Sequence, residues 1–428
     1  MDLTRREFLK LAGGTTVALP YLFSQWGCAP ILTAADQETG LSLGYVAGDV
    51  AHDSARVWLR AQPGSLVSLQ YGKDPALGQF TASDPFPVNP DADNTVHINI
   101  ERLDPATTYY YRAAVAGKRP GPIARFHTAP TPEERAVVKF CFSGDTRESY
   151  QPFTIMDAIR ANQPDFFIHL GDTIYADRNG TANRLPEYWA KYRNNREDAA
   201  SRRLFSDTSA YIVWDDHEVA NNYEGFHPLA ATGRRAFFDY WPVGRNSQEA
   251  DRLYRSFRWG KAMELFLLDA RQYRDRKKGT ILGRQQKQWL FESLASSTAL
   301  FKCVATSVPF YGGGSDRWDG YPRERTELIQ WISEKKITGV FFIAADVHYA
   351  AVTKLPGGLK LKEIVTGPMA ALLNILATGL SKRFEFFFNQ NFNFGMITIN
   401  PNSSPPSMLV EIRDPANETL YKTKIPAA

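Results

Sequence analysis

The order of apolar and polar residues divides the chain into two parts with different patterns. From about residue 42 to 130, short runs alternate apolar with polar side chains, and Pro, Gly and Asp separate the runs. Alternating runs of this length, broken by turn residues, are typical of half-buried strands. The pattern predicts a small all-β sandwich of the fibronectin III or Ig-like kind. The clearest runs are residues 55–59, 66–71, 95–100 and 107–112.

Beyond residue 135 the apolar runs become continuous and alternate with helical patterns. A strand, a helix and a second strand follow one another at residues 137–142, 155–161 and 166–170. This order predicts parallel strands whose two faces are covered by helices, and so an α/β fold. Further strands are expected at 211–214, 264–268, 301–305 and 339–344, with helices at 284–296 and 323–334.

The chain is therefore expected to contain a leader and two domains. Residues 1–35 form the leader, residues 36–135 the β-sandwich domain and residues 136–428 the α/β domain. Pro130-Thr131-Pro132 indicates a linker close to the boundary between the domains.

The N-terminal segment has the features of an export signal. Arg5 and Arg6 precede the apolar stretch Leu11–Phe23, which is too short to span a bilayer but suits the apolar region of a signal peptide. The segment resembles a twin-arginine signal, which implies passage through the Tat translocase to the periplasm or the outside. Lipid anchoring at Cys28 is the less favoured alternative, because Trp26 fits a lipoprotein box poorly.

Composition narrows the chemistry. The 428 residues include 50 Lys and Arg against 46 Asp and Glu, a net charge of +4 that is too small to indicate nucleic-acid-specific binding. Three cysteines cannot form a disulfide framework or a cysteine-rich zinc site. Any metal must be held mainly by Asp, Asn and the seven His.

Acidic residues gather where predicted strands end. Carboxyl ends of parallel strands converge on one crevice, and carboxylates gathered there repel one another unless cations neutralise them. Oxygen and imidazole ligands suit hard or borderline metal ions, and two ions about 4 Å apart can clamp a phosphate and activate a water. We therefore expect a two-metal site. The four clusters are Ser143-Gly144-Asp145, Gly171-Asp172-Thr173, Asp215-Asp216-His217-Glu218 and Asp346-Val347-His348.

Each cluster taken alone also has a structural explanation. A Gly-Asp pair after a strand is commonly a turn, and Asp-Asp-His-Glu can begin a helix. Four clusters, each after an apolar strand, favour a metal site over four unrelated turns. A catalytic serine is disfavoured, because Asp53-Ser54-Ala55 lies in the predicted sandwich and no Gly-x-Ser-x-Gly occurs.

Three segments carry a family resemblance. Gly171 to Tyr175, Trp214 to Asn222 and Ala345 to His348 resemble the signature segments of the PhoD-like alkaline phosphatases, a branch of the calcineurin-like metallophosphoesterases. The resemblance implies an αββα sandwich behind the β-sandwich domain. It also implies metal-dependent hydrolysis of phosphate monoesters, diesters or both, in small-molecule or polymer substrates, outside the cytoplasmic membrane. We expect a monomer. The likeness extends to residues 268–274, 282–290 and 318–322, and to residues 48–49 and 55–58 of the β-sandwich.

The resemblance also implies the metal ligands. Asp172 is expected to bridge the two ions, and Tyr175 to be a phenolate-type ligand. The remaining ligands are Asp346 and His348, one for each ion, and Asp216 and Asn221 around the second ion.

Three further residues have implied roles in catalysis. His217 is expected to donate a proton to the leaving group or to orient the phosphate. Arg147 and Arg271 are candidates for clamping phosphate oxygens, and a structural salt bridge is the alternative for each. A non-catalytic envelope protein that binds a surface polymer, with a degenerate phosphoesterase scaffold, is the rival to the enzyme, and the intact set of acids argues against it.

The chain departs from the family pattern at one ligand. PhoD-like phosphatases have a cysteine just after the first strand of the α/β domain, where this chain has Ser143-Gly144-Asp145. Asp145 instead matches the first aspartate of metallophosphoesterases at large, and Cys141 lies inside the strand and is expected in the core. The resemblance implies iron and calcium, and the missing cysteine leaves Mn, Zn or Mg open.

Overall fold

Strands at the N-terminal end of the described chain form the predicted β-sandwich. The computed structural model describes residues 34–355 and 362–427. Residues 1–33 of the predicted leader, including Cys28, therefore lie outside the described residues. In strand β7 every second side chain is buried, which confirms the alternation seen in the sequence. One layer holds β1 (Leu41–Gly48), β2 (Ser54–Ala61) and β6 (Thr95–Glu101). The other holds β3 (Leu66–Gly72), β4 (Thr81–Ala82), β5 (Phe86–Pro87), β7 (Thr108–Val115) and β8 (Ala124–His127).

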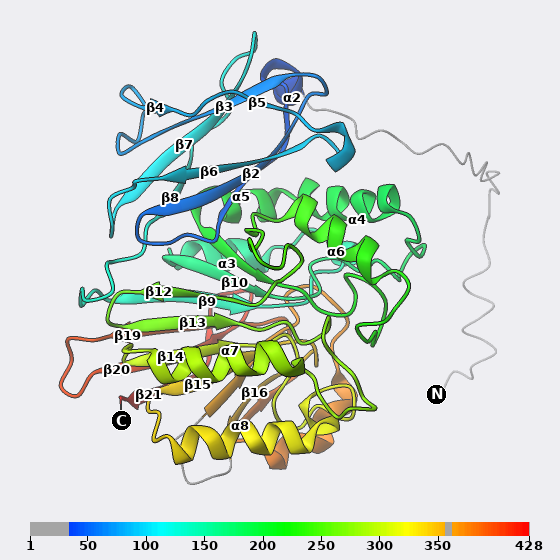
Figure 1. Cartoon of the computed structure of the whole chain (residues 1–428), viewed down its shortest axis with the longest axis vertical. Coiled ribbons are helices and arrows are strands. Elements are labelled where there is room, and N and C mark those ends of the chain that lie inside the picture. Colours follow the sequence, from blue (N-terminus) through cyan, green and yellow to red (C-terminus); the bar gives the residue numbers. More distant parts are fainter. Residues whose placement is uncertain (1–33, 356–361, 428) are drawn as a thin grey trace, which may run out of the picture.

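The sandwich shares a sheet with the α/β part of the chain. Strand β1 pairs in parallel with β11, with Gly48 opposite Ala210, so the β1-β2-β6 layer continues into a nine-stranded sheet. A side chain at Gly48 would clash there, because an added Cβ would lie 2.7 Å from the carbonyl oxygen of Ala210. Trp58 also donates a hydrogen bond to the carbonyl of Asp239 over 2.8 Å. The two parts that the sequence pattern separates are therefore physically joined (Figure 1).

Two sheets face each other in the α/β part. The side chains between them are apolar, with Phe140, Phe166 and Ile168 from the first sheet against Leu265 and Phe341 from the second. In addition to β1, β2 and β6, the first sheet contains β9 (Val138–Ser143), β10 (Phe166–Leu170), β11 (Ser209–Val213), β19 (Phe394–Asn400), β20 (Ser407–Arg413) and β21 (Thr419–Pro426). The second contains β12 (Arg255–Trp259), β13 (Met263–Leu267), β14 (Phe301–Ala305), β15 (Val340–Ala344), β16 (Ala350–Lys354), β17 (Lys362–Val365) and β18 (Phe386–Phe388).

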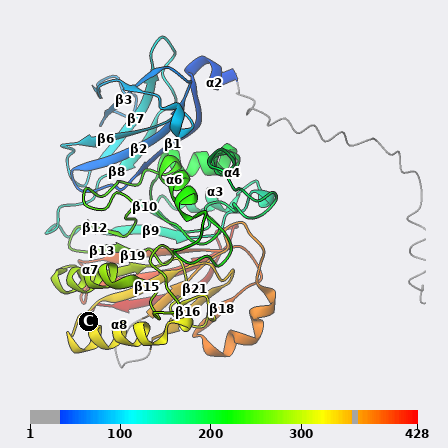
Figure 2. The same ribbon diagram turned by 45° about the vertical axis from the view of Figure 1, so that its right-hand side comes forward.

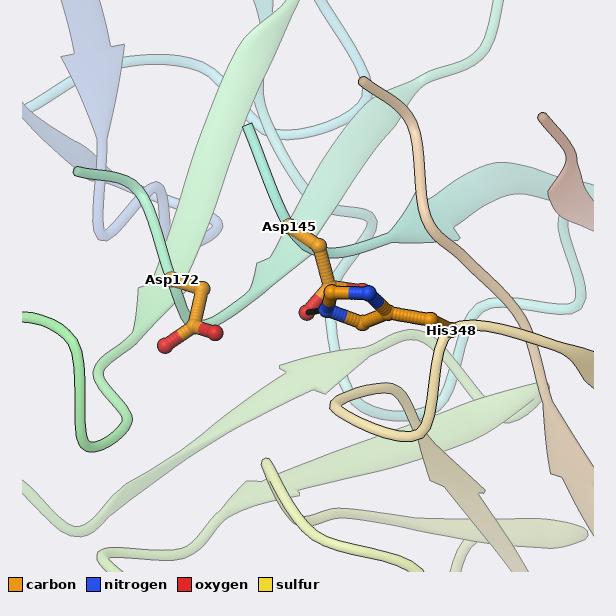
Figure 3. A group of neighbouring side chains, drawn as sticks. All are labelled: Asp145, Asp172 and His348. Atoms are coloured by element: carbon orange, nitrogen blue, oxygen red, sulfur yellow. Dashed lines mark ion pairs between the residues drawn. The ribbon is translucent and has the colours of Figure 1, made fainter. Parts of the chain in front are cut away.

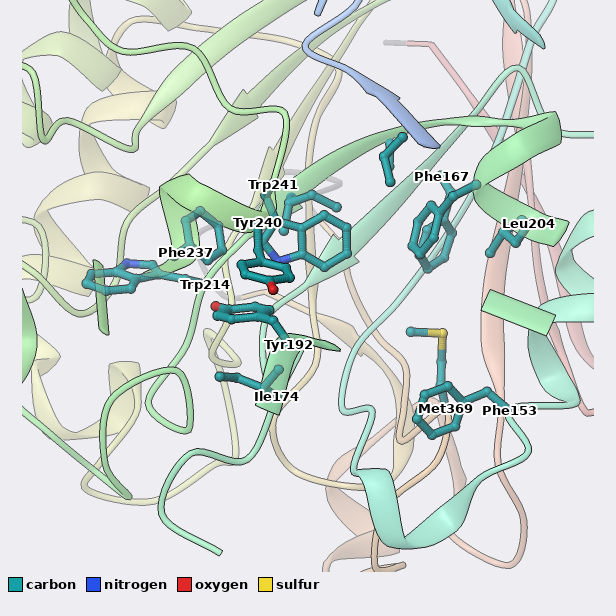
Figure 4. Packing of buried hydrophobic residues seen from close by; sticks show 14 of the residues in the cluster. Phe153, Phe167, Ile174, Tyr192, Leu204, Trp214, Phe237, Tyr240, Trp241 and Met369 are labelled. Carbon is teal, nitrogen blue, oxygen red and sulfur yellow. The ribbon is translucent and has the colours of Figure 1, made fainter. Parts of the chain in front are cut away.

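Helices cover the outer faces of both sheets, which confirms the αββα sandwich (Figures 1 and 2). Over the first sheet, Tyr192 and Tyr240 stack with ring centroids 5.0 Å apart, within the cluster of Figure 4. The helices on that side are α3 (Ile155–Ala161), α4 (Leu185–Glu197), α5 (Ala199–Asp207) and α6 (Ala230–Tyr240). Those on the other side are α7 (Gly283–Ser296) and α8 (Pro322–Glu334). The short helices are α2 (Ala34–Thr39), η1 (Pro90–Ala92), η2 (Glu148–Tyr150), η3 (Trp318–Gly320) and η4 (Ile375–Arg383).

Within the described residues, no helix combines the length and the apolar character that crossing a membrane requires.

Candidate metal centre

The acidic clusters meet at one end of the two facing sheets. Parallel neighbours β9, β10 and β11 lead into Asp145, Asp172 and Asp216. Asp346 and His348 follow β15, which belongs to the second sheet. The acidic clusters therefore lie together as predicted, but they come from strand ends of two sheets rather than of one open sheet.

The backbone at these strand ends is unusual. Asp145, Asp172, Asp346 and His348 have φ angles of 66°, 52°, 68° and 60°, in the left-handed region that such residues seldom adopt. Residues held there cluster at functional sites, where the surrounding structure offsets the strain. Gly171 has a φ of 105°, and an added Cβ would lie 2.6 Å from the Cβ of Asp215. The Gly-Asp motif thus allows two strand ends to approach closely.

Three sets of side chains place possible ligand atoms within 4.8 Å of one another. Asp172 belongs to two of these sets and Asp216 also belongs to two. Figure 3 shows the first set, in which His348 Nε2 lies 3.6 Å from Asp145 Oδ1. A carboxylate shared between neighbouring sets has the position that a bridging ligand needs. The sets are Asp145 with Asp172 and His348, Asp172 with Asp216 and His217, and Asp215 with Asp216 and Asp346.

Several carboxylate oxygens of the site lack the hydrogen bonds that buried anions need. Both oxygens of Asp145 are buried without a hydrogen-bond partner, as are Asp215 Oδ2 and Asp216 Oδ1. Burial raises the pKa of Asp145 and Asp172 well above the usual range, and neighbouring carboxylates raise it further. Leaving such groups charged and unpaired is costly. Metal ions among these oxygens would remove the cost, so the residues fit a metal centre.

His348 presents one ring nitrogen to the site. Its Nδ1 is hydrogen-bonded to the carbonyl of Leu372, which assigns the proton to Nδ1 and leaves the Nε2 lone pair facing Asp145. Tyr175 Oη lies 3.3 Å from the same Nε2. The Tyr175 ring is buried, and burial raises its pKa well above 10. Tyr175 and His348 thus lie together, as the predicted ligand set requires.

His217 lies over Tyr175 and is bound to an acid that the sequence did not indicate. The two ring centroids are 4.2 Å apart, and His217 Nδ1 lies 2.6 Å from Asp177 Oδ1. Burial lowers the pKa of His217, but the hydrogen bond with Asp177 and the charge of Asp216 outweigh it and raise the pKa above 6.5. Asp177 follows Tyr175 in the same turn, and that position was its only signal in the sequence.

Arg271 is completely buried in a network of acids. Its Nε lies 2.5 Å from Asp215 Oδ1, and its Nη1 lies 2.9 Å from Asp316 Oδ2. Its Nη2 has no hydrogen bond, and it lies 3.6 Å from Asp216 Oδ1 and 3.9 Å from Asp346 Oδ1. These contacts correspond to the structural alternative for Arg271, with one N–H group still directed at the acids of the site.

Arg147 and Asn221 lie nearer the surface. The guanidinium of Arg147 is 5.8 Å from the centre of the Tyr175 ring, and its Nη2 donates to Asn179 over 3.2 Å. Arg147 Nε is buried without a hydrogen-bond partner. The side chain of Asn221 is exposed, and its oxygen accepts a hydrogen bond from Arg178 over 3.2 Å.

Two residues without an assigned role in the sequence organise the strand ends. Glu218 is fully buried and accepts hydrogen bonds from the backbone N–H groups of Asp172 and Asp215 over 3.1 and 2.7 Å. It therefore fixes the ends of β10 and β11 relative to each other. Arg317 forms an ion pair with Asp346 from the facing sheet. Cys141 is fully buried in β9, and burial raises its thiol pKa, which confirms that it belongs to the core.

Known proteins resemble most of the chain. The PhoD-like phosphatase family model matches residues 139–382, and the model of the PhoD-like phosphatase N-terminal domain matches residues 27–130. Alkaline phosphatase D of Bacillus subtilis (strain 168) is 26% identical over 425 residues, covering 82% of this chain and 72% of the relative. Purple acid phosphatase 23 of Arabidopsis thaliana is 26% identical over 318 residues, covering 70% of this chain and 66% of the relative.

Solved structures agree on the fold. The structure of PhoD superposes with a TM-score of 0.78 at 22% identity, over 91% of this chain and 93% of that chain. Purple acid phosphatase PPD1 from yellow lupin seeds superposes with a TM-score of 0.67 at 14% identity, over 91% of this chain and 74% of that chain. The sequence comparisons, with this fold, define a phosphoesterase enzyme. More particularly, the chain belongs to the PhoD-like phosphatase family.

Proposed function

We propose that the protein hydrolyses phosphate monoesters, diesters or both, with two metal ions that activate a water molecule, outside the cytoplasmic membrane. The observation that carries this proposal is the group of buried carboxylate oxygens without hydrogen-bond donors on Asp145, Asp215 and Asp216, which lie in ligand sets linked by Asp172 and Asp216. A purely structural acidic turn would satisfy those oxygens with N–H or O–H donors.

The ligand assignment combines the same sets with Tyr175 and Asn221, which the family resemblance implies. Asp145 and His348, with Tyr175 beside them, would hold one ion, and Asp172 would be shared with the second. When bound, the ions would supply positive charge to the phosphoryl oxygens and lower the pKa of a water molecule. Asp216, Asp346 and Asn221 are the proposed ligands of the second ion.

His217 is the proposed proton donor to the leaving group. Its Nδ1 is occupied by Asp177, so Nε2 is the nitrogen from which a proton can move to the ester oxygen. The raised pKa favours the protonated ring. Arg147, next to Tyr175, is the proposed phosphate clamp, and Arg271 would reach the same anion only through its free Nη2.

The test of this mechanism uses two soluble esters. Purified protein is assayed on p-nitrophenyl phosphate and bis-p-nitrophenyl phosphate, before and after chelation and after add-back of single metals. We expect chelation to abolish activity and Asp172→Asn to lose at least about a hundredfold. The matched control is Asp84→Asn, which changes an exposed aspartate of the β-sandwich. Activity that ignores chelation would refute the metal mechanism, and inactivity on both esters with every metal would favour the polymer-binding alternative.

The metals themselves need a direct measurement. Iron and calcium are proposed from the family resemblance, while Asp145 in place of the cysteine ligand is compatible with Mn, Zn or Mg. Elemental mass spectrometry of the purified protein, with Asp145→Asn alongside, would identify the ions and show whether Asp145 holds one of them.

Export and domain limits are part of the same proposal. We propose that residues 1–35 direct twin-arginine export, and that residues 36–135 and 136–428 are the two domains. Replacement of Arg5 and Arg6 by Lys should retain the protein in the cytoplasm, whereas Lys118→Arg, a conservative change at an exposed site, should leave export unchanged. Fractionation and the N-terminal sequence of the exported protein measure both points.

A further inference from the structure

An exposed apolar segment lies next to the candidate metal centre. Eight large hydrophobic side chains are exposed in the described residues, and three of them lie between residues 372 and 376. Leu372, Ile375 and Leu376 are 65%, 64% and 92% exposed. We name residues 372–383 the apolar turn. It includes η4, and the orange part of Figure 2 shows it at the lower right edge of the molecule.

The apolar turn is attached to the site. The carbonyl of Leu372 is hydrogen-bonded to His348 Nδ1, and the N–H of Asn374 donates to the carbonyl of His348 over 3.1 Å. The segment just before it binds the loop of Asp145, because the N–H of Ala370 donates to the carbonyl of Asp145 over 2.9 Å. Whatever binds the apolar turn is therefore brought close to the metal centre.

The apolar side chains are held outwards by a defined set of contacts. Asn389 Nδ2 donates to the carbonyls of Asn374 and Ile375 over 2.9 and 3.2 Å, and it lies 3.0 Å from Thr378 Oγ1. Ala377 is buried against the cluster that contains Val347 and Tyr349. One side of the turn is anchored in this way, while Ile375 and Leu376 are exposed to water.

The charges around the turn select its partner. Lys382 and Arg383 are exposed at its end, and no Asp or Glu occurs from residue 364 to residue 384. Apolar side chains beside basic ones, without acids, are the combination that binds an anionic lipid surface. A twofold contact between two copies would instead bring the Lys382 and Arg383 side chains of both copies together, and like charges oppose such an interface.

We propose that the apolar turn docks the protein on a lipid surface that carries anionic headgroups. Ile375 and Leu376 enter the boundary between headgroups and acyl chains, while Lys382 and Arg383 contact the headgroups. The partly exposed side chain of His348 then lies near the lipid surface. This proposal concerns binding alone and does not depend on the proposed hydrolysis.

Vesicle binding tests the proposal. The purified protein is mixed with vesicles of phosphatidylcholine alone, or with vesicles in which about 30% of the lipid is anionic phosphatidylglycerol. Bound protein is measured by sedimentation. All variants share one N-terminus, so any contribution of the leader is constant. We expect the double variant Ile375→Ser/Leu376→Ser to bind at least about tenfold more weakly. We expect Lys382→Ala/Arg383→Ala to lose about fivefold per charge on anionic vesicles only.

Two controls keep the outcome interpretable. Leu66→Ser removes another exposed leucine, 48% exposed on β3, and it should leave vesicle binding unchanged. Circular dichroism and hydrolysis of p-nitrophenyl phosphate should be the same for wild type and the Ile375→Ser/Leu376→Ser variant, because both side chains point into solvent. Equal vesicle binding by these two proteins overturns the proposal. A dimer in wild type that dissociates in the variant, without lipid binding, also overturns it and identifies a second copy as the partner.

Discussion

Asp145 and Asp216 are both buried, and they follow strands β9 and β11 of the same sheet. Their electrostatic surroundings are nevertheless opposite. The pKa of Asp145 is raised well above its usual range by burial and by the charges of other acids. Burial also acts on Asp216, but Arg271 and His217 outweigh it and hold its pKa below 3.8. One side of the acidic cluster is thus compensated by cationic side chains of the protein, and the other side is not. This difference shows where a nearly neutral chain has the uncompensated acids that could bind a metal ion.

Removal of Arg271 should have the largest effect on stability. Arg271→Met leaves Asp215 buried without its cation, whereas Asp316 keeps its pairs with Arg274 and Arg276. Loss of one partner from a buried ion pair costs about 3–5 kcal/mol. Urea unfolding of the chelated protein measures the change in the free energy of unfolding. Arg119→Met, which breaks the exposed pair with Glu38, should change it by less than about 0.5 kcal/mol. Equal effects of the two substitutions would contradict the comparison between the two sides of the cluster.

Metal removal should make stability depend on pH. In the folded metal-free protein the pKa values of Asp145 and Asp172 lie above their unfolded values. Stability is then fully present at pH values below the unfolded pKa, and it is lost as the pH rises towards the folded values. Metal at about 100 times its Kd should restore about 2.7 kcal/mol. Thermal unfolding from pH 5 to 8, with and without chelator, measures this effect, and parallel curves would contradict it.

Asp145→Asn should separate metal binding from folding. The amide removes one anionic ligand, so we expect about a hundredfold loss of hydrolysis together with loss of bound metal. The chelated variant should be more stable than chelated wild type, because no charge is buried at this position. Activity, elemental analysis and thermal unfolding measure the three quantities. A chelated variant less stable than wild type would show that Asp145 stabilises the fold without metal.

Asp177→Asn should have the smallest effect. Asp177 contacts His217 and belongs to none of the ligand sets. We therefore expect kcat to fall about tenfold for phenyl phosphate and by less for p-nitrophenyl phosphate. The nitrophenolate leaving group needs little protonation, so the ratio of the two kcat values reports on proton donation. Asp157→Asn, at an exposed pair with Arg203, is the control. An equal loss on both esters would assign Asp177 a purely structural role.

Much of the α/β part could be predicted because its strands and helices carry strong local patterns. The strand Phe166–Leu170 and the helix Ile155–Ala161 match the predicted ranges at both ends. Strands β19, β20 and β21 were not predicted, since β19 joins the first sheet by pairing with β9 from far away in the sequence, and β20 and β21 extend the sheet from β19. The partners Asp177, Asp316 and Arg317 escaped prediction for the same reason, because a side-chain contact between distant segments leaves no periodic signal.

The sequence by itself determined where each acid stands relative to its own strand. An apolar run that stops at Gly-Asp or Asp-Asp places the carboxylate at a strand end whatever the rest of the fold does. Only the tertiary structure decided which strand ends meet, that Asp346 and His348 come from the facing sheet, and that the β-sandwich joins the first sheet at Gly48 and Ala210. It also decided which carboxylates receive an arginine and which remain without a donor. These outcomes depend on long-range packing, and packing sets the desolvation and the charges that determine what an acidic side chain can bind.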